Sequence, residues 1–268
     1  MHTAKHKLVA LALTALLVCA CSGLESFFVE EPIAAGIDSP DKDVSEHLRK
    51  VLQAARVLPK SASMRGRLGM AYDVNGLRDA ALVTYEQAEA LDPTDFRWPY
   101  FSAHLSAETG EHQRALEALQ RALVIDADYP PAWLWRGTWL LDAGRPDEAL
   151  IAFEQAATLD AGPVATFGRA RVMIARGRHQ QAIELLEPLT KSVNHPFIHR
   201  TLGEALRAVG RIEEARMAMA RGKDALPISW PDERRDQRNV HVRGYASYEF
   251  AKNLSASGRM KEALTILK

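Results

Sequence analysis

The sequence predicts an all-α protein made of repeated helical hairpins, and two observations lead to this expectation. Alanine, leucine, arginine and glutamate dominate long stretches, whereas runs of β-branched residues are scarce, as is typical of helices. Glycines recur at intervals of 34, 34, 33 and 33 residues, and an alanine follows each glycine by five positions. The glycines are Gly76, Gly110, Gly144, Gly177 and Gly210, and the alanines are Ala81, Ala115, Ala149, Ala182 and Ala215. A fixed period of this length indicates a stacked repeat array rather than one compact core.

The residue types inside one period resemble the tetratricopeptide repeat (TPR) motif. The repeat that spans residues 62–95 matches this motif at Leu68, Gly69, Tyr72, Ala81, Tyr85, Ala88 and Pro93. Small residues at Gly69 and Ala81 would let two antiparallel helices approach closely, while bulky residues fill the space beside them. The resemblance implies a right-handed superhelical TPR solenoid of antiparallel helix pairs, with five repeats in residues 62–228.

Irregular segments flank the five repeats. Residues 43–61 are expected to form a lone helix that caps the first hairpin, because Ala54 and Pro59 keep the spacing of the repeat. Residues 244–268 restart the pattern as an incomplete sixth repeat that stops in mid-helix at Lys268. Two interpretations of this stop remain open: the last helix frays, or the sequence is part of a longer chain.

A charged insertion, residues 229–243, separates the fifth repeat from the sixth. It contains four arginines, three acidic residues and Trp230. A long charged insertion in a solenoid is typical of a surface loop, and in some proteins it forms a binding lip. The sequence does not choose between these two interpretations.

The first residues read as a lipoprotein signal peptide, residues 1–21. Lys5 and Lys7 precede an apolar run that is too short to span a bilayer but suits a signal peptide. The run ends in Val18-Cys19-Ala20-Cys21, which resembles a lipobox with Cys21 as the lipidated residue. The alternatives are a plain signal peptide cut near here and a cytoplasmic Cys-x-Cys metal site. Residues 22–42 are expected to form a flexible tether.

The lipobox resemblance implies a membrane anchor of several acyl chains, palmitate among them, on Cys21. Ser22 follows the cysteine, where an inner-membrane retention signal would often place aspartate. This resemblance favours the outer membrane, with the repeats facing the periplasm; in an organism with one membrane, its outer face is the destination.

The TPR resemblance also implies a concave groove, lined by the first helix of each hairpin, in which a partner peptide or helix binds. Aromatic rings would give contact area there and guanidinium groups would pair with carboxylates. The alternative is that the rings pack against neighbouring helices and the charges are merely solvated. Trp135 and Trp139 have no clear place in the motif and are contact candidates if exposed. The expected groove residues are Arg97, Tyr100, His104, Phe167, Arg171, Phe197, Arg200, Arg207, Tyr245, Tyr248 and Lys252.

Catalytic and cofactor motifs are not evident in the sequence. His195 and His199 have a metal-ligand spacing, but Pro196 lies between them and they need not share a helix face. No cysteine follows Cys21, and the sequence contains no phosphate-binding loop, nucleophile elbow or HExxH motif. A formal net charge of zero gives no footprint for nucleic acid. We therefore expect no enzyme activity, cofactor, metal, nucleic acid or small-molecule substrate.

The resulting expectation is a membrane-anchored scaffold that binds other envelope proteins, in the assembly of an envelope or secretion complex. Two alternatives come from other functional classes. The chain is the non-catalytic part of a longer enzyme, or it is a glycan-binding component of an export system.

Overall fold

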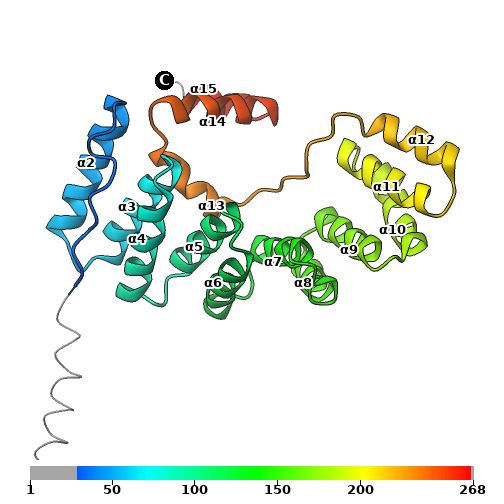
Figure 1. Ribbon diagram of the computed structural model, residues 1–268, viewed down its shortest axis with the longest axis horizontal. Helices are drawn as coiled ribbons and strands as arrows, with labels where there is room; N and C mark the ends of the chain where they lie inside the picture. Colours follow the sequence, from blue (N-terminus) through cyan, green and yellow to red (C-terminus); the bar gives the residue numbers. More distant parts are fainter. Residues whose placement is uncertain (1–28, 267–268) are drawn as a thin grey trace, which may run out of the picture.

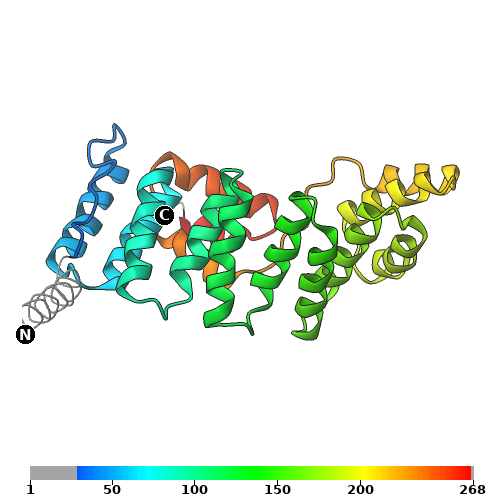
Figure 2. The ribbon, with the colours of Figure 1, turned by 60° about the horizontal axis from the view of Figure 1, so that its bottom comes forward.

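The computed structural model describes residues 29–266. The signal peptide, Cys21 and residues 22–28 of the expected tether lie outside the described residues. Within them every regular element is a helix, and the chain forms an elongated, curved array (Figures 1 and 2). The prediction of an all-α TPR solenoid is therefore confirmed. No described helix combines the length and the apolar character that crossing a membrane requires.

Five helical hairpins form the body of the array. They are α3 (Ala62–Val74) with α4 (Arg78–Leu91), α5 (Arg97–Glu108) with α6 (His112–Ile125), α7 (Pro130–Asp142) with α8 (Pro146–Thr158), α9 (Pro163–Ala175) with α10 (His179–Ser192), and α11 (Pro196–Ala208) with α12 (Ile212–Arg221). Each helix packs against its hairpin partner, and each hairpin packs against the next. The helices of a hairpin are antiparallel because each connecting turn is short.

The turn inside each hairpin needs a left-handed residue, and the periodic glycine supplies it. At Gly76 φ is +82°, and the other four periodic glycines also have positive φ. The amide of Gly76 donates to the carbonyl of Asp73, and the amide of Leu77 donates to that of Tyr72 over 2.9 Å. These bonds satisfy carbonyls at the end of α3, as in a Schellman motif.

Small residues allow the paired helices to touch. A Cβ atom added to Gly137 of α7 would lie 2.7 Å from ring atoms of Phe153 in α8, and one added to Gly69 would lie 2.7 Å from Tyr85. The periodic alanines, such as Ala81, are fully buried. Close approach at these points produces a continuous apolar core along the array.

The first described segment is ordered against the repeats. The helix α2 (Lys42–Val57) begins at Asp41, whose side chain accepts hydrogen bonds from two amides of its first turn. Residues before it contact repeat one: Arg65 donates to the carbonyl of Glu30 over 2.7 Å, and Tyr72 donates to that of Ile33. Residues 29–40 are therefore packed chain rather than the flexible tether expected for residues 22–42.

The C-terminal segment departs most from the expected array. After α12 the chain turns back along the array and forms α13 (Glu233–Asp236) and a 3-10 helix, η2 (Gln237–His241). A last hairpin follows, α14 (Tyr245–Ala256) with α15 (Met260–Ile266). Figure 1 shows this hairpin above the N-terminal repeats and far from α12. The described part of the expected sixth repeat, residues 244–266, therefore does not continue the stack, because the return of residues 222–243 carries it to the opposite end.

Candidate partner-binding groove

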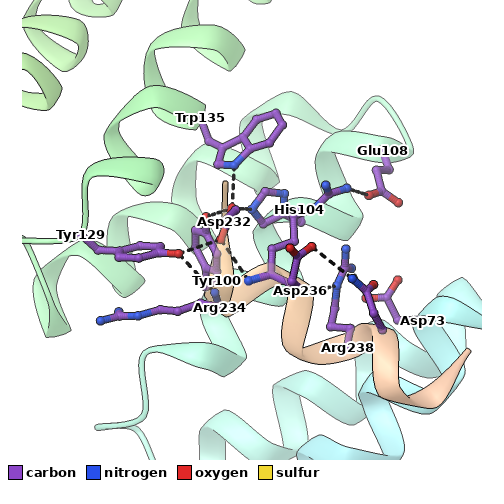
Figure 3. Close-up of polar contacts among 12 residues, drawn as sticks. Asp73, Tyr100, His104, Glu108, Tyr129, Trp135, Asp232, Arg234, Asp236 and Arg238 are labelled. Atoms are coloured by element: carbon purple, nitrogen blue, oxygen red, sulfur yellow. Dashed lines mark hydrogen bonds and ion pairs between the residues drawn. The ribbon is translucent and has the colours of Figure 1, made fainter. Parts of the chain in front are cut away.

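The groove of the first three repeats is filled by the protein's own chain. We call residues 229–241 the return segment; it lies against α3, α5 and α7 (Figure 3). Asp232, Arg238 and His241 of this segment are buried. The charged insertion is thus neither a plain surface loop nor a lip at the rim, because its polar side chains find their partners inside the groove.

Asp232 is the central contact of the return segment. Its carboxylate is 5% exposed and accepts hydrogen bonds from the hydroxyl of Tyr100 at 2.6 Å and from that of Tyr129 at 2.8 Å. It also accepts from the indole nitrogen of Trp135 at 2.9 Å. Burial and the adjacent Asp232 carboxylate raise the pKa of Tyr100 well above its usual value, so the hydroxyl stays protonated and donates.

His104 lies beside this carboxylate in an aromatic enclosure. The imidazole is 2% exposed, and its Nε2 is 3.8 Å from a carboxylate oxygen of Asp232. The rings of Tyr100, Trp135 and Trp139 contact it edge-on. Burial, and then the positive charge of nearby arginines, lowers the pKa of His104 well below its usual value. The imidazole is therefore neutral at pH 7 and packs as an aromatic ring.

Arginines of the return segment pair with acids on the first two repeats. Arg234 pairs with Asp126 at 2.5 Å and its guanidinium lies over the rings of Phe96 and Tyr129, 4.2 and 4.1 Å from their centroids. Arg235 pairs with Glu108 at 2.8 Å. Arg238 pairs with Asp73, which also accepts a hydrogen bond from Tyr85. The filled groove therefore satisfies carboxylates and guanidinium groups on both sides.

Two of the expected groove residues are consequently unavailable to a partner. Tyr100 is fully buried, and His104 is almost so, beneath the return segment. Their prediction as partner contacts is corrected here: Tyr100 donates a hydrogen bond to Asp232 of its own chain, and His104 packs beside that carboxylate. Arg97 lies at the edge of this region, where it pairs with Asp95 at 2.5 Å and lies over the ring of Trp98.

The groove is open over the third to fifth repeats. A hollow of about 310 Å³ is present there, and we call it the open groove. Its walls include Phe167 and Phe197, whose ring centroids are 5.8 Å apart, and the guanidinium of Arg171, 3.7 Å from Asp142. The structure thus brings three of the expected residues together. Its remaining walls are Trp135, Thr138, Phe153, Val164, Gly168, Pro227, Ile228 and Trp230.

The other expected groove residues lie outside the open groove. Arg200 and Arg207 line a separate shallow hollow between α11 and the end of α12. Tyr245, Tyr248 and Lys252 are exposed on α14. Their assignment to a continuous groove is corrected, because α14 is folded back over the N-terminal repeats instead of stacking on repeat five.

Three family models of the tetratricopeptide repeat match the chain. One matches residues 67–132 and again 102–166, a second matches residues 140–199, and a third matches residues 196–221. The matches follow one another along α3 to α12. The chain belongs to the tetratricopeptide repeat family.

Curated TPR relatives match parts of the chain. Cytochrome c-type biogenesis protein CycH of Rhizobium meliloti is 30% identical over 130 residues, which are 47% of this chain and 34% of CycH. Superkiller protein 3 of Schizosaccharomyces pombe is 35% identical over 72 residues, 27% of this chain and 5% of that protein. The chain therefore spans about a third of the first relative and a twentieth of the second.

Solved TPR structures share the fold. MamA from Desulfovibrio magneticus RS-1 is similar with a TM-score of 0.56 at 17% identity, over 61% of this chain and 97% of that structure. YrrB, described as a TPR protein with an unusual peptide-binding site, gives a TM-score of 0.56 at 17% identity. The match covers 66% of this chain and 92% of the YrrB structure. With the family matches, this fold identifies the chain as a protein–protein interaction scaffold.

Asp232 and Trp230 are the contacts that the TPR pattern does not reveal. The sequence signal for them is the tripeptide Trp230-Pro231-Asp232, which places an aromatic ring and a carboxylate beside a rigid proline inside an otherwise charged insertion. Trp135 and Trp139, which have no place in the motif, line the surface that this tripeptide contacts: the ring centroids of Trp135 and Trp230 are 4.5 Å apart.

Proposed function

We propose that this protein is a membrane-anchored scaffold of the cell envelope that binds a segment of a partner protein in the open groove. The observation that carries the proposal is the hollow of about 310 Å³, which Phe167, Phe197 and Trp230 line together with Arg171. Aromatic walls with one cation suit an apolar side chain and a neighbouring carboxylate.

The filled half of the groove supports this chemistry. There the same concave surface holds a piece of the protein's own chain through Trp230, whose ring is tilted against that of Trp135, and through the Asp232 carboxylate. A partner segment in the open groove is expected to use the same combination, with its carboxylate on Arg171. Bidentate pairing favours arginine for this contact.

Site-specific crosslinking in cells tests the proposal. A photoreactive residue at Thr138, in the open groove, should capture a partner, whereas one at Glu154, exposed on α8, should not. The purified partner should then bind at least about tenfold more weakly to the Arg171→Glu, Phe197→Ala variant. Capture of the same proteins from both positions, or unchanged affinity of the variant, would contradict the proposal.

Membrane anchoring through Cys21 is tested separately. The Cys21→Ala variant should leave the membrane fraction while keeping the helical signal of the parent in circular dichroism, because the repeats do not use this residue. The Cys19→Ala variant is the matched control and should remain in the membrane fraction. A Cys21→Ala variant that still fractionates with membranes would place the anchor elsewhere.

The match to CycH favours one envelope process for this scaffold, the biogenesis of c-type cytochromes. A strain that lacks the protein should then have less covalently bound haem in its membrane fraction, measured by haem staining after denaturing electrophoresis. Normal haem staining would contradict a role in the biogenesis of c-type cytochromes but would not contradict the role as a scaffold.

A further inference from the structure

A second hollow lies at the N-terminal end of the array, far from the open groove. We call it the terminal hollow; its volume is about 810 Å³. Its walls come from α2, from the first turns of α3, and from residues 240–243, where the return segment ends. The apolar part of its lining consists of Val51, Ala54, Val57, Leu58, Met64 and Val240.

The apolar lining belongs to a helix face that other repeats bury. Val51 and Ala54 of α2 precede Tyr85 and Ala88 of α4 by one period of 34 residues. In α4 these positions are fully buried, whereas on α2 Val51 is half-buried and Ala54 is exposed. Val57, on the same helix, is 65% exposed. Among residues 29–266, no helix covers α2 where a hairpin partner would lie.

Positive charges surround this apolar face. Lys50, Arg67 and Arg243 line the terminal hollow, and its lining contains no aspartate or glutamate. None of the three has a carboxylate within 4.0 Å in the part of the chain that the structure describes. Most other arginines of the array are paired, so three cations without an acid around one hollow call for an external anion.

Their combined field is evident at His47, which lines the same hollow. Burial first, and then Arg243, Lys50 and Arg67, lower the pKa of this imidazole to about 4. The imidazole is therefore neutral at pH 7, and the positive charge around the hollow comes from Lys50, Arg67 and Arg243.

We infer that the terminal hollow docks an acidic amphipathic helix of a partner protein. The uncovered helix face calls for apolar side chains at helical spacing, and the three cations call for carboxylates beside them. Residues 1–28 carry a single acid, Glu25, against Lys5 and Lys7, so they lack the complementary charge.

The test uses the purified full chain and a labelled, acidic amphipathic peptide. A helical peptide of 16 residues, with leucine at helical spacing and glutamate on the flanks, matches the length of α2, which also has 16 residues. Its fluorescence anisotropy should rise as the parent protein is added, which shows binding. The same peptide with lysine in place of glutamate should bind at least about tenfold more weakly.

Charge reversal in the protein should exchange these preferences. The Lys50→Glu, Arg67→Glu variant should bind the acidic peptide about tenfold more weakly than the parent does, and it should bind the basic peptide more tightly. The matched control, Lys42→Glu with Lys191→Glu, has the same net charge at exposed positions outside the hollow and should bind as the parent does. Val57→Ser should weaken binding of the acidic peptide but leave the preference for the acidic over the basic peptide unchanged, because it removes apolar contact only.

Three outcomes would overturn the inference. The first is no binding of the acidic peptide by the parent. The second is an equal loss of affinity for the acidic peptide in the charge-reversed variant and in its control. The third is tight binding of phosphatidylglycerol vesicles that displaces the peptide and depends on Lys50 and Arg67, which would assign the site to a membrane surface. None of these outcomes bears on the open groove, which the Arg171 variant tests.

Discussion

At the scale of single residues, the glycines of the repeat act through two different physical causes. Gly144 has φ of +70°, and a Cβ atom added there would meet nothing within 4 Å. Gly137 has helical backbone, but a Cβ atom added there would lie within 2.8 Å of three ring atoms of Phe153. The first glycine is required by backbone conformation and the second by packing.

Alanine substitutions separate the two causes. Gly144→Ala should lower the free energy of unfolding by about 1 kcal/mol, because an L residue resists the left-handed region. Gly137→Ala should lower it by about 1–3 kcal/mol through overpacking. In urea denaturation, Gly137→Ala should lower the free energy of unfolding less when Phe153→Leu is also present. The loss caused by Gly144→Ala should be the same with and without Phe153→Leu. Equal relief of both would show that the turn glycine is also a packing residue.

At the scale of elements, the hairpins were predictable from the sequence, whereas the return segment was not. The contacts of a hairpin join residues within one period, as Gly69 and Tyr85 show, so the repeat pattern carries them. The hydrogen bond from Tyr100 to Asp232 joins residues 132 positions apart, and the pair of Arg238 with Asp73 joins residues 165 apart. No periodicity encodes such pairs.

The candidate site divides in the same way. Phe167, Arg171 and Phe197 lie together because they follow the repeat register of α9 and α11, and their contact with a partner stays a prediction. Tyr100 and His104 also follow the register, but what covers them is decided by the path of the chain after α12. The register of the repeat predicts which side chains face the groove and says nothing of the chain that lies in it.

A pair of histidines joins α2 to η2, and it predicts a dependence of stability on pH. Nε2 of His47 and Nδ1 of His241 are 3.1 Å apart. Burial and nearby positive charge lower the pKa of each imidazole to about 4. An unfolded histidine titrates near pH 6.5, so between pH 6.5 and 4 the unfolded chain binds protons that the folded protein does not. The free energy of unfolding should therefore fall as the pH falls through this window.

Thermal unfolding at several pH values checks this dependence. The slope of the melting temperature between pH 6.5 and 4 should be shallower in His47→Gln than in the parent. Some slope should remain, because buried His104 has a lowered pKa and contributes with the same sign. His112→Gln, outside the pair, is the control and should keep the parent's slope. Identical slopes in all three proteins would contradict the role of the pair.

At the scale of the whole molecule, the return segment changes how the array shares its stability. In a simple solenoid each repeat is stabilised by its neighbours alone. Here Asp73, Glu108 and Asp126 of repeats one and two all pair with the return segment. We therefore expect the first repeats and the C-terminal segment to unfold as one cooperative unit, and the helices α9 to α12 to unfold as an ordinary solenoid.

Removal of the central carboxylate tests this division. Asp232→Ala should lower the free energy of unfolding by about 2–4 kcal/mol, because the buried hydroxyl of Tyr100 and the half-buried donors of Tyr129 and Trp135 lose their acceptor. Amide hydrogen exchange should quicken in residues 229–241, α14 and α15, and stay unchanged in α11 and α12. Asp142→Ala removes an exposed acid and should change stability by less than about 0.5 kcal/mol. Faster exchange along the whole array would show a single cooperative unit.

The return of the chain also brings sequence-distant ends of the molecule into contact. The amide of Tyr245 donates to Asp41, and the amide of Arg243 donates to Asn75, so the array closes into a ring of covalent and hydrogen-bonded links. An open superhelix can lengthen like a spring when a load is applied between its ends. In this molecule a force applied between α2 and α14 would act on these two hydrogen bonds. Elastic bending would then be confined to the repeats outside the ring, those of α9 to α12.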